Sequence, residues 1–127
     1  MGPEAAEAAW TLRVWDGRDL VFSSGGHWLH PLFDLEARIA DLGDPARLRL
    51  EDRVTGRAAA FLVVRLGFRE LHSHCLSDRA VPVLERAGVR TTCEARVPRI
   101  GCATEDLLAG VEDPEAAWAL LAARRGR

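Results

Sequence analysis

The chain has 127 residues, the length of one ordinary domain, and 48% of them are apolar, which excludes both a two-domain protein and a disordered composition. A net charge of −2 predicts no general attraction to nucleic acid or to an anionic membrane, and the longest uncharged apolar run, Ala58–Val64, is too short to span one. Met1–Glu7 does not resemble a secretory signal and the three cysteines lack CxxC spacing, so we expect reduced thiols and a cytoplasmic location.

The N-terminal part of the chain predicts a short helix and a β-hairpin. Pro3–Ala9 is rich in alanine and glutamate, which favours a helix. Trp10–Trp15 alternates apolar and polar residues, as a half-buried strand does. Asp16-Gly17 then favours a tight turn, and Asp19–Phe22 is the expected return strand.

Two helices are expected next. Leu29–Asp41 has apolar residues at helical spacing and ends before Gly43-Asp44-Pro45. Val54–Leu66 is apolar on most sides, with Asp52 as a suitable N-cap and Gly67 as a suitable C-cap. This second segment is therefore predicted to be a buried helix packed on a sheet.

The second half of the chain alternates between strands and helices. The expected elements are a strand at Arg69–Cys75, a helix from the cap Ser77 to Ala87, a strand at Val89–Val97, a short helix at Ala103–Ala109 and a final helix at Pro114–Ala123. A hairpin followed by this alternation predicts a three-layer α/β/α fold with a mixed sheet. No repeat or linker interrupts the pattern, so residues 1–127 are expected to form one domain.

Several segments together resemble a known family. The most specific is Asp52-Arg-Val-Thr-Gly56-Arg-Ala-Ala-Ala60, and the supporting ones are the hairpin Leu12–Phe22, Glu85–Val89 and Val97-Pro98…Gly101-Cys102 with Glu105. From about Trp10 to Leu121 the chain resembles the bacterial and archaeal family called domain of unknown function 1893. The resemblance implies a cytidine-deaminase-like fold and no particular activity. The loop before Cys102 is shorter here than in other members.

The zinc motif of deaminases is absent from the expected positions. A zinc deaminase needs a His or Cys with a Glu two residues later at one helix start, and Pro-Cys-x-x-Cys at the next. The corresponding segments here read Asp52-Arg53-Val54 and His74-Cys75-Leu76-Ser77-Asp78. We therefore expect no resident metal, no cofactor and no hydrolytic deamination of cytidine.

The histidines do not replace that motif. His72 and His74 fall on one face of their strand, with Cys75 on the opposite face. We interpret this pair as hydrogen-bonded locally, and His27 and His30 as exposed or capping groups.

A candidate anion site comprises Asp52, Arg53, Gly56 and Arg57 at the start of the expected buried helix. Arg53 and Arg57 are four residues apart and would share a helix face, where the free N–H groups and the helix dipole already favour an anion. Gly56 would let a ligand approach closely. The alternative is that Asp52 only caps the helix, that the arginines form a solvated rim, and that Gly56 relieves packing. All seventeen basic residues are arginine, which weakens the case for any one of them.

Cys102 is a second candidate. It follows Gly101 and precedes a predicted helix, and a helix N-terminus lowers the pKa of a thiol and so favours a nucleophile. Glu105 or a histidine of the 72–74 strand would orient it, and Asp52 would act as acid or base. The alternative is an inert buried thiol, as we expect for Cys75 and Cys93.

Three functions remain open from the sequence. The first is binding of a small anionic or nucleotide-like molecule at the Asp52–Arg57 segment, on a deaminase scaffold without its zinc. The second is an enzyme that uses Cys102. The third is a homo-oligomerising or partner-binding module that uses the aromatic segment Trp28–Phe33 or a sheet edge.

Overall fold

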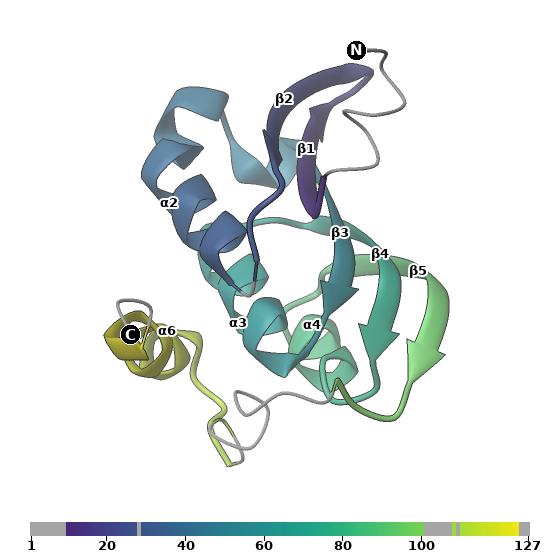
Figure 1. The fold of residues 1–127 in the computed structure, drawn as a ribbon, viewed down its shortest axis with the longest axis vertical. Coiled ribbons are helices and arrows are strands. Elements are labelled where there is room, and N and C mark those ends of the chain that lie inside the picture. Colours follow the sequence, from purple (N-terminus) through teal and green to yellow (C-terminus); the bar gives the residue numbers. More distant parts are fainter. Residues whose placement is uncertain (1–9, 28, 101–107, 109, 125–127) are drawn as a thin grey trace.

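A five-stranded mixed sheet is the framework of the computed structural model, in which residues 10–27, 29–100, 108 and 110–124 are described (Figure 1). The strand order is β2-β1-β3-β4-β5. β1 pairs antiparallel with β2 and with β3, whereas β3, β4 and β5 are parallel. The strands are β1 Leu12–Asp16, β2 Asp19–Ser24, β3 Arg49–Thr55, β4 Glu70–Ser77 and β5 Arg90–Val97. The predicted α/β fold with a mixed sheet that begins with a hairpin is confirmed.

Four helices are described: α2 His30–Leu42, α3 Arg57–Leu66, α4 Val81–Arg86 and α6 Pro114–Arg124. α3 is the central one and contacts α2, α4 and α6. It ends where the sequence indicates, because Gly67 has a positive φ of 95° and its N–H reaches the carbonyl oxygens of Val63 and Val64. α4 is shorter than expected, since Ser77 ends β4 and its hydroxyl accepts the N–H of Arg79 in the turn that follows.

The central strand β3 is the element that the sequence analysis missed. Asp52, Arg53 and Val54 were assigned to the buried helix or its cap, but all three lie in β3 and the helix starts at Arg57. Leu48 and Leu50 alternate with Arg49 and Glu51 as a strand requires. The pattern is hidden because Asp52 stands where the next apolar residue is expected.

The two faces of the sheet differ in what covers them. Leu12, Val14, Leu50 and Leu71 point to one face and join the buried side chains of α3 in a single core. The described helices gather on this side (Figure 1). The described helices thus form a layer against this face of the sheet. The opposite face, which we call the open face, carries polar and aromatic side chains of β1, β3, β4 and β5.

The helices predicted at Pro3–Ala9 and Ala103–Ala109 fall wholly or largely outside the described residues. Among the helices that are described, none combines the length and apolar character needed to cross a membrane.

Candidate functional site

The predicted anion-site residues do not share one helix. Asp52 and Arg53 lie in β3, Gly56 is the N-cap of α3, and Arg57 is its first residue. The prediction that Arg53 and Arg57 face the same way on a helix is therefore wrong.

Arg53 turns to the open face. Its Nε donates a hydrogen bond to the carbonyl oxygen of Trp10 at 2.6 Å, and its guanidinium lies 4.2 Å from the centre of the Trp10 ring. Arg53 thus helps to hold the segment before β1 on the sheet.

Arg57 holds the segment that precedes α6. Its Nη2 donates to the carbonyl oxygen of Val111 at 2.5 Å, and its Nε to that of Leu108 at 3.4 Å. Glu112 Oε1 is 3.3 Å away, and the guanidinium lies 5.0 Å from the Phe61 ring. Arg57 therefore places a positive charge at the start of α3 while it also has a structural role.

Asp52 is a buried acid rather than a helix cap. Its carboxylate accepts a hydrogen bond from the Thr55 hydroxyl at 3.0 Å, and that hydroxyl lies 2.8 Å from the hydroxyl of Ser73. Burial raises the pKa of Asp52 to about 7, although the hydrogen bonds from Thr55 and from backbone N–H groups and the charge of His74 act in the opposite direction. A carboxyl group with this pKa exchanges its proton near neutral pH.

The carboxyl ends of the three parallel strands form a basic edge. Arg57, Arg79 and Arg99 each stand two residues after the last residue of β3, β4 and β5 respectively. Gly56 is extended, with φ −93° and ψ −176°, and no side chain caps the N-terminus of α3. We call this region, Gly56 with the three arginines, the carboxyl edge. It combines helix N–H donors with positive charge, which is the chemistry that binds an anion.

The helix starts seen in the structure also lack zinc-deaminase ligands. α3 begins Gly56-Arg57-Ala58, and the segment before α4 reads Ser77-Asp78-Arg79-Ala80. Neither contains a histidine or a cysteine. Cys75 lies within β4, so it does not replace the missing Pro-Cys-x-x-Cys motif.

The other candidates are only partly described. Cys102, Glu105 and Trp28 lie outside the described residues. Cys75 and Cys93 are free, half-buried thiols. Phe33 is buried and its ring centre lies 5.0 Å from that of Trp118 on α6, so it belongs to the core rather than to an exposed aromatic surface.

The open face carries a connected polar cluster. Arg13, Glu51, His72 and Thr92 are register partners across β1, β3, β4 and β5, and His74 and Glu94 adjoin them. We call these six residues the open-face cluster. His72 and His74 share this face and are hydrogen-bonded locally, as predicted.

The acids of the open-face cluster were missed by the sequence analysis. Glu94 lies in a correctly predicted strand, two residues after Thr92, and alternation alone places both on one face. Glu51 could be found only by recognising β3. Burial alone would raise the pKa of Glu51, but hydrogen bonds from His74 and Trp15 and the charge of Arg13 outweigh it, so the pKa lies below its ordinary value.

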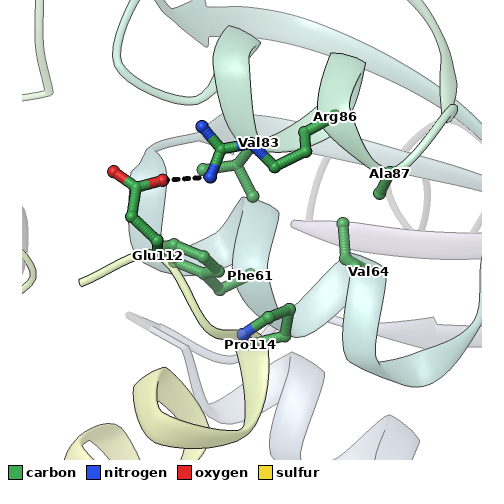
Figure 2. Close-up of a pocket in the computed structure, with 7 residues that line it drawn as sticks. All are labelled: Phe61, Val64, Val83, Arg86, Ala87, Glu112 and Pro114. Carbon is green, nitrogen blue, oxygen red and sulfur yellow. Dashed lines mark hydrogen bonds and ion pairs between the residues drawn. The ribbon is translucent and has the colours of Figure 1, made fainter.

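Among the described residues, two of the hollows lie on the helical side. The first, about 180 Å³, is enclosed by α3, α4 and the start of α6, and Figure 2 shows the ion pair between Arg86 and Glu112 at its side. The second, about 200 Å³, lies between α4 and β5. Neither is lined by Asp52, Arg53, Gly56 or Arg57.

The mixed sheet and its helices form an α/β domain with a cytidine-deaminase-like fold. Consistent with this, the fold is similar to that of dCMP deaminase from the cyanophage S-TIM5 in its apo form, with a TM-score of 0.50, 15% identity, and coverage of 76% of this chain and 100% of that one. Within this class the chain belongs to the family described as domain of unknown function DUF1893, whose sequence profile matches residues 14–123.

A solved member of that family is similar over most of its length. The DUF1893 protein TM1506 from Thermotoga maritima matches with a TM-score of 0.83 and 20% identity, covering 94% of this chain and 83% of that one. No curated protein sequence matches the chain significantly.

Proposed function

We propose that this protein binds a small anionic, nucleotide-like molecule at the carboxyl edge of its sheet and does not deaminate it by zinc chemistry. The observation that carries the proposal is the uncapped start of α3 together with an arginine after each parallel strand. In α/β sheets ligands usually bind at the carboxyl ends of strands. The similar cyanophage protein is named for acting on dCMP, a nucleotide with one phosphate group, which fits the same ligand class.

The proposal differs from the sequence-based one in its residues. Gly56 and Arg57 are retained, and Arg79 and Arg99 join them because they follow β4 and β5. Arg53 is excluded because its guanidinium lies over Trp10. Asp52 is buried in the middle of β3 and is not among the residues proposed to contact the ligand.

Thermal unfolding with three probes tests the proposal: inorganic phosphate, dCMP and uncharged deoxycytidine. A ligand at about ten times its Kd adds about 1.4 kcal/mol to the free energy of unfolding, which raises Tm by about 3–6 °C in a domain of this size. We expect dCMP to raise Tm, phosphate to do so more weakly, and deoxycytidine to have no effect. Ammonia release from dCMP should stay at background.

Two variants locate the effect. Gly56→Asp should remove the response to dCMP, since an aspartate at the N-cap bonds the helix N–H groups and repels an anion, and the extended backbone there accepts any residue. Arg79→Ala should weaken the response without changing the cap. Arg90→Ala is the matched control because Arg90 starts β5 at the opposite edge. Equal responses in Arg79→Ala, Arg90→Ala and the unaltered protein would contradict the proposal.

A further inference from the structure

The open-face cluster contains a ligand set that the carboxyl edge does not use. His72 Nε2 and His74 Nδ1 each lie 3.1 Å from the same oxygen, Oε2 of Glu94. One ligand atom from each of these three residues falls within 4.8 Å of the others. Around an ion with metal–ligand bonds of about 2.0–2.2 Å, neighbouring ligand atoms are about 3.0–3.5 Å apart, and both nitrogen–oxygen distances to Glu94 fall in this range. The two imidazole nitrogens, which lie within 4.8 Å of each other, would draw together around the ion.

The remaining nitrogen of each imidazole is held by a second group. His72 Nδ1 lies 2.7 Å from the Thr92 hydroxyl, and His74 Nε2 lies 2.8 Å from Glu51 Oε2. Histidines that ligate metals usually have such partners, which fix the orientation of the ring and the nitrogen that faces the ion.

Glu51 is itself fixed in place. Its Oε1 accepts hydrogen bonds from Arg13 Nη2 at 2.9 Å and from Trp15 Nε1 at 3.0 Å. The positive charge of Arg13 balances the negative charge of Glu51. Glu94 therefore supplies the net negative charge that faces the two imidazoles.

Hydrogen bonding around His74 calls for a cation. Its two nitrogens face carboxylate oxygens, of Glu51 on one side and Glu94 on the other, and carboxylates only accept hydrogen bonds. A neutral imidazole carries one N–H, so it can donate a hydrogen bond to only one of the two carboxylates. The other position needs a second proton or a metal ion between His74 Nδ1 and Glu94.

We infer that His72 Nε2, His74 Nδ1 and Glu94 form a binding site for a divalent transition metal ion of the zinc type, on the sheet face opposite to the helices. Two imidazoles and one carboxylate are ligands that Zn²⁺ accepts, with further coordination positions left to water or to a bound molecule. All three side chains are accessible from solvent. This inference revises the expectation of no metal and does not depend on the anion site.

Calorimetric titration of the reduced full chain, free of any histidine tag, with ZnCl₂ tests the inference. We expect one equivalent of Zn²⁺ to bind and His72→Ala and His74→Ala each to weaken binding at least tenfold. Thr92→Val, which removes only the partner of His72 Nδ1, should weaken it by a smaller factor. His27→Ala is the control, since His27 is an exposed histidine in the loop before α2.

Titration with Co²⁺ identifies the ligand atoms. The site predicts visible absorption from nitrogen and oxygen ligation, without the strong near-ultraviolet band of thiolate ligation. Should His74→Ala fail to fold, His74→Gln retains a polar side chain at that position and takes its place. The inference is overturned if the His72→Ala/His74→Ala double variant binds Zn²⁺ as tightly as the unaltered chain, or if Co²⁺ shows thiolate ligation.

Discussion

Asp52 is enclosed by protein on nearly every side, in the middle of the strand that joins the hairpin to the parallel half of the sheet. Its partners are the Thr55 hydroxyl and backbone N–H groups rather than an arginine. An ionised carboxylate in this position raises the free energy of the folded state, because its hydrogen bonds offset only part of the hydration free energy that it loses. The protonated form is therefore favoured in the folded chain to a higher pH than in the unfolded chain.

This preference makes stability depend on pH in a defined direction. The pKa of Asp52 rises from 3.8 in the unfolded chain to about 7 in the folded one, so the folded state binds more protons between these values. The free energy of unfolding therefore falls as the pH rises through this window. Asparagine does not titrate, and Asp52→Asn should gain stability relative to the unaltered protein by about 2–3 kcal/mol between pH 5 and pH 8.

Denaturant unfolding of both proteins at several pH values measures this difference. Comparing the two proteins cancels the contributions of the histidines and other acids. Asp78→Asn is the control, since Asp78 is exposed and pairs with Arg96. A difference between Asp52→Asn and the unaltered protein that stays constant with pH would show that Asp52 has an ordinary pKa.

At the scale of elements, local signals predict the hairpin, α2, the end of α3, β5 and α6. Asp16-Gly17 and Gly67 are examples, because their backbone conformations are set by the residues themselves. β3 escapes prediction because Asp52 is stabilised by the Thr55 hydroxyl, which itself contacts Ser73 of β4, and alternation along one strand does not reveal such contacts. The expectation that Arg53 and Arg57 share a helix face was wrong for the same reason, whereas the pairing of His72 with His74 was recovered from alternation alone.

Arg57 couples two elements that are far apart in the sequence. Its hydrogen bonds to the carbonyl oxygens of Leu108 and Val111 join the start of α3 to the segment before α6. Arg57→Ala would leave these partly buried carbonyl groups without their charged donor. We expect the free energy of unfolding to fall by about 2 kcal/mol.

Hydrogen exchange distinguishes this coupling from a general loss of stability. In Arg57→Ala, amides of α6 should exchange faster by a larger factor than amides of β3 and β4. Arg90→Ala is the control, because its exposed ion pair with Glu70 contributes less than about 1 kcal/mol. Uniform acceleration across the chain would argue against a local role for Arg57.

At the scale of the whole molecule, the sheet separates two sets of chemistry. The carboxyl edge lies at the ends of the parallel strands, whereas the open-face cluster lies on the strands themselves, on the side away from the helices. No residue belongs to both sets. The two proposed sites should therefore behave as independent sites.

Two variants, each altered at one of the two sites, check this independence. Gly56→Asp should lose the response to dCMP and keep the affinity for Zn²⁺, whereas His72→Ala/His74→Ala should do the opposite. In the unaltered protein, stabilisation by the two ligands together should equal the sum of their separate effects. Loss of both responses in either variant, with the fold intact, would show that the sites are coupled.

The surroundings of Trp10 affect the fluorescence of its indole ring. Its ring lies 3.9 Å from the guanidinium of Arg13 and 4.2 Å from that of Arg53, and it meets the ring of His74 edge-on at 5.1 Å. An imidazole that gains a proton becomes a better electron acceptor and quenches the fluorescence of a neighbouring indole. Trp118, by contrast, packs against Phe33 and Arg65 on the helical side. The emission of Trp10 is thus an intrinsic, label-free reporter of what occupies the nitrogen atoms of His74.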